Sequence, residues 1–460
     1  MTDPDLQIQT AKARFFVDHG WLAAVLPAEA SRFRVLDPDV AYTVRGGGGQ
    51  LVERDPDVEI APVSELSGEA PVAVVSLDAS RPDHGRPSDA ARRIGASATV
   101  RVAAQRTRRE LRRRGYRSVS LLLWERDEGL RIPGLTSPSS RQLSDRFPRR
   151  ALVVGSRREP RQTAFERAIS EAGEIAGRRL APSWPLVRVG GLVAICDGAI
   201  LRVATAGATE HVRAQTGSLQ ALGDAPLSAL VAARVPRLLG QGEFVATRWL
   251  LESRLPGRPA PRSLSSSLLA DCIDFLAELH GLGTDREGES ASVWAATLEP
   301  VIPPSRRPVL RRLTERLDAE LAAVPRGFGH GDFCSHNLLV SDGRLAGVVD
   351  WEAASRSSLP LVDLLHLTLT ASSPPDIYRW GPALIHHLLP VPKSGGGPVI
   401  RGYLERIALD LDRPTLEALV AAYWLRRASY QLGTYIERSR DRLWIERNVV
   451  GVLDAFGGAE

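Results

Sequence analysis

The sequence predicts a mixed α+β protein in which an α/β domain (residues 1–150) precedes a small antiparallel β section (181–260) and a helical section (261–460). Three observations predict this organisation. The chain has 460 residues, more than one compact core usually holds, since typical domains have roughly 100–200 residues. Short apolar runs separated by glycine turns follow residue 184. Apolar residues then recur at helical spacing from residue 263 onward.

The composition is that of a soluble globular protein, with 43% hydrophobic and 25% charged residues. The net charge of +5 comes almost entirely from arginine, because only Lys12 and Lys393 are lysines. The densest basic run, 101–117, lacks the interleaved aromatic residues of a nucleic-acid stacking platform. It therefore predicts a solvated helix face rather than a nucleic-acid or anionic-membrane site, and we expect neither of these partners.

The expected location follows from the N-terminus, the apolar runs and the cysteines. Residues 1–16 are acidic and carry no apolar core of a signal peptide, and runs such as 151–155 are too short to span a bilayer. Cys196, Cys272 and Cys334 are far apart and odd in number, so they support neither a disulfide framework nor a zinc knuckle. We expect a reducing, cytoplasmic setting.

The first 150 residues show the pattern of a layered α/β unit. A buried strand is predicted at 70–77, a helix at 96–115 ending in glycine, and a second strand at 116–125. The glycine run at 45–50 has no phosphate-loop spacing and is interpreted as a flexible turn, and the Pro-, Ser- and Arg-rich stretch 131–150 as a connector.

The stretch LRRRGYRSVSLLLWERDEGLRIPG, within this α/β domain, faintly resembles the late part of class I methyltransferase domains. The glycine-rich loop that such enzymes need after their first strand is not evident. We therefore expect a non-catalytic accessory domain that positions an acceptor or a protein partner.

The β section contains three short strands at 185–189, 192–196 and 199–204, separated by two glycine turns. The second turn, Asp197-Gly198, predicts a type I′ hairpin, in which both central residues have positive φ. A helix and a further strand that ends in a Pro-Gly turn follow at 208–224 and 244–257.

The helical section begins with a serine cluster that can cap a helix over 265–281, where apolar residues recur with a period of three to four. Further amphipathic segments follow at 308–325, 359–370, 378–389, 415–437 and 441–456. A small β lobe followed by a larger helical lobe predicts a cleft between the two.

The stretch GFGHGDFCSHNLLVSDGRLAGVVDWE, residues 327–352, concentrates polar residues between apolar runs. Asp332 lies in a tight loop before a strand, Asn337 begins that strand, and Asp350 ends its hairpin partner. Because a hairpin brings its open ends together, these three side chains are expected to lie close to one another. Two carboxylates and an amide oxygen suit Mg²⁺, and phosphoryl transfer also needs a carboxylate that orients the attacking hydroxyl.

Two other interpretations of this stretch stay open at the level of the residues. A zinc or di-metal hydrolase would use His330, Asp332 and His336, although an HxD pair without further clustered ligands is a weak metal signal. Alternatively, Asp332 and Asn337 are turn residues and Asp350 caps a strand. Cys334 has no designated base, which favours a packing role.

HGDFCSHN followed by a hairpin and DWE resembles the catalytic core of the aminoglycoside phosphotransferase and choline kinase-like family, which has the protein-kinase-like bilobal fold. FLAELHGL, RLPGRPA and LPLVDLLHL extend the resemblance, which covers roughly residues 185–455. It implies ATP and Mg²⁺ as cofactors. It further implies Asp332 as catalytic base, His330 as support for the loop backbone, and Asn337 and Asp350 as Mg²⁺ ligands.

The match departs from the family at the nucleotide phosphates. Arg202 stands where a lysine normally holds the α/β-phosphates, and Gln215 where its glutamate partner is expected. Arginine is a permanent cation that can bind phosphate with a forked geometry, and choline kinase-like members tolerate it here. The strand 247–253, ending in Glu252 and Ser253, is expected to meet adenine through backbone groups.

The sequence therefore predicts an ATP- and Mg²⁺-dependent O-phosphotransferase acting on a hydroxyl of a sugar, an amino alcohol or an aminoglycoside-like molecule. The alternative is a kinase-fold nucleotide-binding or scaffold protein that is catalytically weak or silent, with an Arg202 that contacts no nucleotide. The intact Asp332, Asn337 and Asp350 favour the enzyme, because degenerate kinases usually lose their metal ligands.

Overall fold

The computed structural model describes most of the chain after residue 150 and selected segments before it. The described residues are 28, 30, 32–35, 50–54, 56–61, 63–67, 70–78, 102–124, 150–157 and 162–457, with gaps at 183, 189–190, 206–208, 245–246, 283–287, 373–377 and 435–436. The predicted glycine turn at 45–50 and connector at 131–150 fall outside them except at their last residues.

Contacts group the chain into two compact units. The first comprises Met1–Arg213 and Leu238–Arg254, and the second comprises Ala214–Arg237 and Leu255–Glu460. The three-part division into 1–150, 181–260 and 261–460 stays a prediction, as does a cleft between the β section and the helical section.

The first unit contains a six-stranded mixed sheet of order β2-β1-β3-β4-β6-β5. Its strands are β1 (Arg32–Val35), β2 (Gln50–Leu51), β3 (Val58–Ile60), β4 (Val72–Asp78), β5 (Ser118–Trp124) and β6 (Arg150–Ser156). The pairs β1–β2, β1–β3 and β3–β4 are parallel, whereas β6 runs antiparallel between β4 and β5. The predicted α/β character of this region is confirmed.

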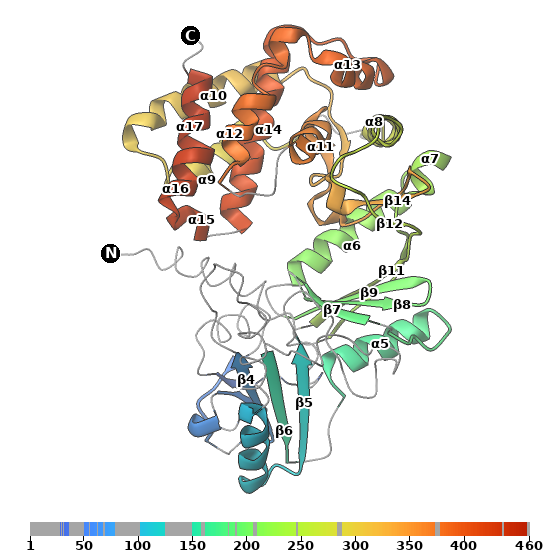
Figure 1. Ribbon diagram of the computed structural model, residues 1–460, viewed down its shortest axis with the longest axis vertical. Coiled ribbons are helices and arrows are strands. Elements are labelled where there is room, and N and C mark those ends of the chain that lie inside the picture. Colours follow the sequence, from blue (N-terminus) through green and yellow to red (C-terminus); the bar gives the residue numbers. More distant parts are fainter. Residues whose placement is uncertain are drawn as a thin grey trace, which may run out of the picture. The chain divides into compact units, whose positions relative to one another are not determined.

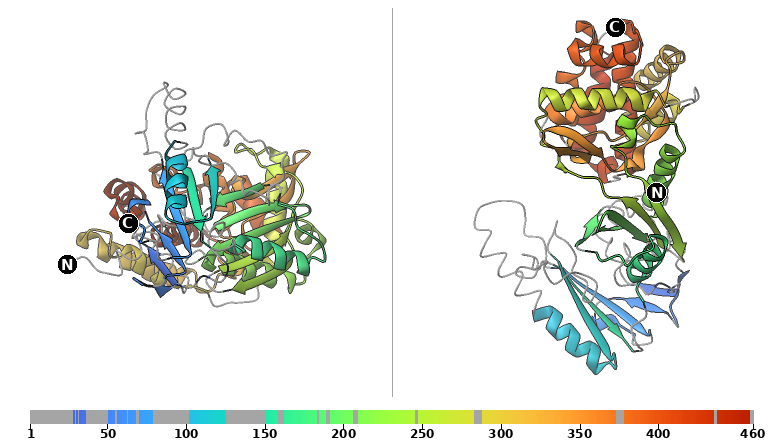
Figure 2. Two further views of the ribbon diagram at one scale, coloured as in Figure 1. Left: turned by 90° about the horizontal axis from the view of Figure 1, so that it is seen from below. Right: turned by 90° about the vertical axis from the view of Figure 1, so that its right-hand side faces the viewer.

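A helix over 102–113 precedes β5, as the helix–glycine–strand pattern predicts, and it lies alongside the sheet in Figure 2. Gly115 takes a φ of +87°, a left-handed conformation that ends the helix at little steric cost. Ala104 and Leu111 are fully buried, which marks the packed side of this helix.

A second sheet of the first unit is antiparallel throughout, with five strands in the order β10-β11-β9-β8-β7. Its strands are β7 (Trp184–Arg188), β8 (Gly191–Cys196), β9 (Ala199–Thr205), β10 (Leu238–Phe244) and β11 (Thr247–Ser253). The hairpin predicted at Asp197-Gly198 joins β8 to β9, but the predicted turn type is wrong. Among the described residues of that turn only Gly198 has positive φ, at +70°, so it is not type I′.

Helix α5 (Ala164–Ile175) joins the two sheets of the first unit into one core. Thr163 and Glu166 form a capping box at its start, and Phe165 and Ile169 are among its buried residues. These side chains share a cluster with residues of both sheets, and Trp249 Nε1 on β11 donates to Glu171 Oε2 at 2.9 Å. The antiparallel sheet therefore packs through α5 with the N-terminal sheet.

The second unit is mainly helical and carries two small antiparallel sheets (Figure 1). Helix α6 (Thr209–Gly223) runs across the division between the units. The helices that follow are α7 (Ala229–Ala232), α8 (Ser266–His280), α9 (Ala291–Leu298), α10 (Arg307–Glu320), α11 (Val362–Ser372), α12 (Trp380–His387), α13 (Gly397–Arg406), α14 (Arg413–Thr434), α15 (Glu437–Arg440), α16 (Arg442–Ile445) and α17 (Gly451–Gly457). The strands are β12 (Arg258–Pro259), β13 (Gly327–Gly329), β14 (Leu338–Ser341), β15 (Arg344–Val348) and β16 (Ser355–Ser358).

Helix α14 is the centre of the helical part, because α9, α10 and α11 all pack against it. Its Trp424 is fully buried and donates to Asn448 O at 2.9 Å. No helix among the described residues is long and apolar enough to cross a bilayer. The predicted fold class, a small antiparallel sheet and a helical section preceded by an α/β region, is confirmed.

Helix α8 begins where the serine cluster predicts, since Ser265 Oγ accepts from Leu268 N at 3.2 Å. Its buried Asp271 binds β15, accepting from Arg344 Nε at 2.7 Å and from Leu345 N at 3.0 Å. The hydrogen bond from Arg344 lowers the pKa of Asp271 although burial acts to raise it, and the hydrogen bond from Leu345 N also lowers it. This carboxylate ties α8 to the hairpin that carries the candidate site.

We expect Asp271→Asn to lower the melting temperature most at neutral pH, with a difference that shrinks as the pH falls toward 3. Because the folded-state pKa of Asp271 is depressed, its stabilisation is present above the unfolded pKa of about 3.9 and is lost as pH falls through the folded value. Thermal unfolding from pH 7 to pH 3 measures this. The control is Asp274→Asn, also on α8, which breaks an exposed ion pair with Arg406 of α13 and should have a small effect. If the difference in melting temperature between Asp271→Asn and the wild type does not change with pH, the stabilising role assigned to the ionised Asp271 is wrong.

Candidate active site

A tight loop over 330–337 connects β13 to β14 and carries the first of the predicted site residues. Gly331 has a φ of +80°, and a Cβ atom there would lie 2.1 Å from Ala353 O. Only glycine fits a left-handed backbone at this close approach. The glycine of the HGD motif is thus needed to place Asp332 against the segment that follows Asp350.

The backbone of this loop is held by Asp363, a buried residue of α11. Its two carboxylate oxygens accept from His330 N at 2.7 Å and from Gly331 N at 2.8 Å. Hydrogen bonds to a carboxylate are stronger than those between neutral groups, so the two consecutive amides are fixed firmly. Asp363 therefore sets the backbone path just before Asp332.

His330 fixes the same loop through its fully buried ring. Nε2 lies 3.0 Å from Val349 O, and Nδ1 accepts from Asp332 N at 3.3 Å. These partners assign the proton of the neutral imidazole to Nε2. The ring also packs edge-on to Trp351 at 4.6 Å between centroids. These contacts suit the predicted role of His330 as a support for the loop backbone.

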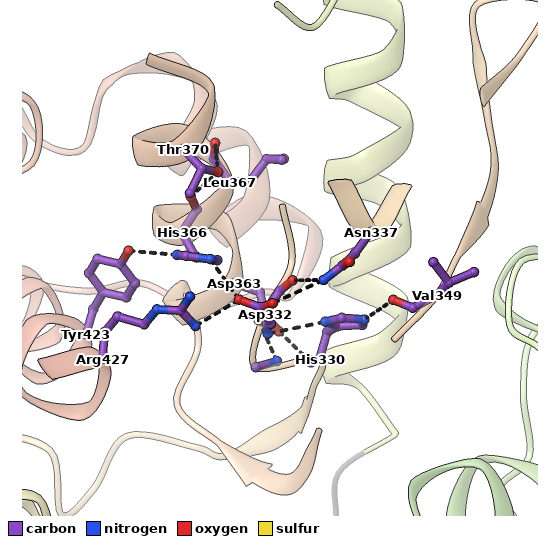
Figure 3. A network of polar contacts seen from close by, with 11 residues as sticks. His330, Asp332, Asn337, Val349, Asp363, His366, Leu367, Thr370, Tyr423 and Arg427 are labelled. Carbon is purple, nitrogen blue, oxygen red and sulfur yellow. Dashed lines mark hydrogen bonds and ion pairs between the residues drawn. The ribbon is translucent and has the colours of Figure 1, made fainter. Parts of the chain in front are cut away.

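The Asp332 carboxylate is the centre of a polar network drawn from the loop, α11 and α14 (Figure 3). Oδ1 pairs with Arg427 Nη1 at 2.8 Å and lies 3.2 Å from His366 Nε2. Asn337 Nδ2 donates to Oδ2 at 3.1 Å and to the backbone O of Asp332 at 2.9 Å. His366 is itself oriented by Tyr423, whose hydroxyl lies 2.9 Å from Nδ1.

These contacts keep Asp332 ionised. Burial acts to raise its pKa, but the hydrogen bond from His366 and the charge of Arg427 outweigh it and lower the pKa below the usual range. Burial lowers the pKa of His366, so that ring is neutral near pH 7. The Asp332 side chain keeps 29% of its surface exposed, so a substrate hydroxyl can still reach it.

The hairpin β14–β15 brings the other two predicted residues to the same end of the ladder. Leu338 pairs with Val348, and Val349 N donates to Asn337 O at 2.9 Å. Asp350 follows directly and takes a left-handed conformation with φ of +70°. Such a conformation is strained for a residue other than glycine and is often found at functional sites. The register thus places Asn337 opposite Val349, the residue before Asp350. That the side chains of Asn337 and Asp350 lie close together stays a prediction.

The donor set of this site fits Mg²⁺. Asp332 and Asp350 offer carboxylate oxygens, and with Asn337 Nδ2 directed at Asp332, Oδ1 is the amide atom left for a metal ion. Hard oxygen donors in this number suit an ion that keeps several waters and completes its shell with phosphates. The assignment of Asn337 and Asp350 as metal ligands stays a prediction.

A soft-metal site fits less well. His330 of the HxD pair has both ring nitrogens bound to Val349 O and Asp332 N, and His336 is exposed. Among the described residues the group whose ligand atoms lie within 4.8 Å of one another is instead Asp332, Cys334 and His366. Burial raises the pKa of the Cys334 thiol to about 11, so the thiolate that binds zinc is disfavoured.

Three residues of the network, Asp363, His366 and Arg427, are absent from the sequence-based site. Asp363 and His366 lie in LPLVDLLHL, part of the resemblance, and Arg427 lies in the amphipathic segment 415–437, but neither pattern assigns a role to these single residues. A usable signal exists: Asp363 and His366 are polar residues three apart in the otherwise apolar first half of α11, a position where burial demands a partner.

The predicted nucleotide-binding residues of the first unit form an ion pair that the sequence does not reveal. Arg202 on β9 aligns with Leu250 on β11, so Glu252 is its diagonal neighbour on the same face of the sheet. Arg202 Nε lies 3.0 Å from Glu252 Oε1, and the Glu252 side chain is 3% exposed. A strand glutamate thus gives Arg202 a carboxylate partner.

The other two nucleotide-site residues are less informative. Ser253 ends β11 and pairs with Ala199. Gln215 is buried and belongs to the second unit, so its place beside Arg202 stays a prediction. Gly191, the described residue of the first glycine turn, has a φ of +132° and lies too close to Val203 O for any side chain.

Residues 192–393 match the model of the phosphotransferase enzyme family, which confirms the resemblance that the motifs predict. No curated protein matches the sequence. Similar solved structures include the aminoglycoside phosphotransferase APH(3'')-Id from Streptomyces rimosus in complex with ADP and streptomycin. It is 22% identical, with 56% of this chain and 97% of that chain covered and a TM-score of 0.37.

Two further solved structures are similar over the same part of the chain. The macrolide 2'-phosphotransferase MphH from Brachybacterium faecium is 19% identical, with 56% of this chain and 89% of that chain covered and a TM-score of 0.37. A thermostable mutant of the aminoglycoside phosphotransferase APH(4)-Ia is 19% identical, with 58% and 90% covered and a TM-score of 0.38.

Proposed function

We propose that this chain, whose residues 192–393 match the phosphotransferase enzyme family, transfers a phosphoryl group from ATP to a hydroxyl of a small molecule. The observation that carries this proposal is the Asp332 carboxylate. It is ionised, partly exposed and held by contacts from the loop, α11 and α14, and it lies beside Asn337 at the open end of the hairpin that carries Asp350.

Asp332 orients the acceptor hydroxyl and accepts its proton. A carboxylate with a depressed pKa is a weak base, but the transition state of phosphoryl transfer is loose and asks mainly for positioning and charge stabilisation. His366 and Arg427 fix the position of Oδ1, so the free face of the carboxylate has one orientation toward the substrate. Asn337 and Asp350 would hold Mg²⁺, which when bound neutralises phosphate charge.

Arg202 would supply the fixed positive charge that contacts the nucleotide phosphates, in place of the usual lysine. Its partner Glu252 keeps the guanidinium in one position on the sheet, as an acidic partner does for the lysine of related folds. The backbone after Glu252 would meet the adenine ring. The acceptor classes that remain are sugars, amino alcohols and aminoglycoside-like molecules.

Nucleotide binding is the first test of this proposal. We expect ATP and ADP to raise the melting temperature by several degrees in the presence of Mg²⁺ and by less without it. A ligand at 100 times its Kd adds about 2.7 kcal/mol to the free energy of unfolding. The absence of a shift with any nucleotide would rule out the kinase assignment. Nucleotide binding without phosphoryl transfer to any acceptor in a broad hydroxyl screen would favour the silent, scaffold-like alternative.

Arg202→Ala should weaken ATP binding by about tenfold or more, because it removes a charge-assisted contact to phosphate worth roughly 1.5–3 kcal/mol. The change is best made together with Glu252→Gln, since a buried carboxylate without its partner destabilises the fold by itself. Isothermal titration with ATP and Mg²⁺ measures the effect. The matched control is Arg213→Ala with Glu210→Gln, an exposed ion pair on α6. Equal ATP affinity in both double variants would show that Arg202 does not contact the nucleotide.

A further inference from the structure

A cavity of about 260 Å³ lies in the second unit, next to the catalytic loop. One wall is the segment that directly follows Asp350, and Glu352, Ala353 and Ser355 contribute to it. Ala353 O is also the atom that leaves no space for a side chain on Gly331. The cavity and the loop that carries Asp332 thus share the segment 352–355.

The same two helices that hold Asp332 also line this cavity. Val362 directly precedes Asp363 on α11, and Arg426 directly precedes Arg427 on α14. A molecule in the cavity would therefore contact the residues adjoining those that fix the catalytic loop and the Asp332 carboxylate. This placement fits an acceptor subsite better than an unrelated surface hollow.

Two arginines, Arg326 and Arg426, give the cavity its chemistry. Arg326 Nη1 donates to the backbone O of Ser357 at 3.3 Å. Within the described part of the chain neither guanidinium lies within 4.0 Å of a carboxylate oxygen. Both groups are half-buried, and each still has donors available for a ligand.

The pKa shifts of Arg326 and Arg426 indicate that nearby carboxylates only partly neutralise their positive charges. Burial lowers the pKa of Arg326 and of Arg426, and it outweighs the opposing effect of the nearby carboxylates. Glu289 is near both arginines, but its Oε2 accepts from Trp294 Nε1 at 2.7 Å. A bound anion would supply the charge that the surrounding protein does not.

We infer that this cavity binds an oxyanion, a carboxylate or a phosphate, carried by the acceptor whose hydroxyl meets Asp332. The inference rests on the proposed function and narrows its substrate class. Guanidinium groups match both oxyanions through forked, paired hydrogen bonds, and serine hydroxyls on β16 can add further donors. A cavity of about 260 Å³ has room for a small acid or a sugar phosphate.

Direct binding tests the inference independently of turnover. The probes are sn-glycerol 3-phosphate, which carries hydroxyls and a phosphate, and D-glycerate, which carries hydroxyls and a carboxylate. Glycerol is the neutral control without either anion. Titration calorimetry is run with saturating ADP and Mg²⁺, so that the nucleotide site is filled. Kanamycin, a polycation, is the competitor. It would bind in this cavity only if the carboxylates of Glu289 and Glu352, rather than the two arginines, determined the charge of the ligand.

Arg426→Met and Arg326→Met are compared with Arg311→Met, which removes the same charge from an exposed position on α10. We expect at least one of the two acids to bind while glycerol does not, and which acid binds tells carboxylate from phosphate. Loss of a charge-assisted contact should raise Kd about tenfold or more in each cavity variant and less than twofold in Arg311→Met. Should Arg426→Met fail to fold, Arg426→Lys keeps the charge without the fork and should still weaken binding severalfold.

Three results would overturn the inference: neither acid binds, the cavity variants bind the acids as tightly as Arg311→Met, or kanamycin displaces the acids and is itself weakened by Glu352→Gln. Its failure can be told apart from failure of the proposed function. If neutral alcohols are phosphorylated and acid binding does not depend on Arg426, the protein is a phosphotransferase but the anionic acceptor is wrong. If acids bind in an Arg426-dependent way but no acceptor is phosphorylated, the anion site is supported and the phosphotransferase proposal is wrong.

Discussion

Asp332→Asn is expected to lower kcat by about 10²–10⁴-fold, the range typical for loss of a positioned acid–base group, while changing ATP affinity less than twofold. The amide keeps the shape of the side chain and can still accept one hydrogen bond from His366 or Arg427, so the fold should persist. It can no longer take the proton of the acceptor hydroxyl. Steady-state kinetics with a coupled ADP assay and nucleotide titration separate the two effects.

The matched control is Cys334→Ala, a change in the same loop to a buried side chain without a proposed role in the reaction. It should leave kcat within a few-fold of the wild type. Asp332 has a depressed pKa, so protonation of this carboxylate should not limit the rate anywhere near neutral pH. If Asp332→Asn retains a tenth or more of the wild-type kcat, the assignment of Asp332 as the base is wrong.

Much of the loop and hairpin could be predicted from the sequence because the determinants are local. Eight residues, HGDFCSHN, set a loop whose glycine must adopt positive φ, and a two-residue turn at Asp342-Gly343 starts the hairpin. An irregularity between Leu339 and Val340 then shifts the register by one residue, which the sequence does not indicate. The shifted register pairs Leu338 with Val348 and brings Asn337 opposite Val349. Turn chemistry was less predictable: positive φ at both residues, as type I′ requires, occurs at Asp342-Gly343 and not at Asp197-Gly198.

The network around Asp332 could not be derived in the same way, because it joins residues far apart in the chain. Arg427 lies 95 positions after Asp332, and only the packing of α14 on α11 brings it within 2.8 Å of the carboxylate. The Arg202–Glu252 pair is similar in kind, because it depends on strand β11 lying next to β9 with a particular register. A search for buried polar residues in apolar segments would have raised Asp363 and His366, but not their partners.

The N-terminal sheet and α5 show a second limit of prediction from sequence. Strands β4 and β5 and the 102–113 helix follow from apolar patterning, whereas the core that α5 builds between the two sheets depends on tertiary contacts. Trp249 on β11 donates to Glu171 of α5, so the strand that pairs with Arg202 is anchored from outside the family match. Helix α5 thus supports the β section structurally.

Asp363→Ala should lower the free energy of unfolding by about 3–6 kcal/mol and reduce kcat at the same time. Asp363 accepts two backbone hydrogen bonds, from His330 at 2.7 Å and Gly331 at 2.8 Å, and bonds to a charged group are worth roughly 1.5–3 kcal/mol each. Asp363→Asn should lose about half as much, because an amide offers one acceptor and turns donors toward the other N–H. Chemical unfolding and kinetics below the melting transition measure the two effects.

A suitable control separates lost stability from a misplaced catalytic loop. Asp441 also accepts two hydrogen bonds, from Trp444 N at 3.0 Å and from the Tyr378 hydroxyl at 2.7 Å, but it caps α16 and touches no part of the loop. Asp441→Ala should therefore cost stability, about 1 kcal/mol for the cap alone, and leave kcat unchanged. Since Asp363 fixes the backbone that presents Asp332, both of its variants should lose kcat even at temperatures where they are fully folded. A folded Asp363→Ala protein with wild-type kcat would mean that β13, His330 and Trp351 suffice to hold the loop.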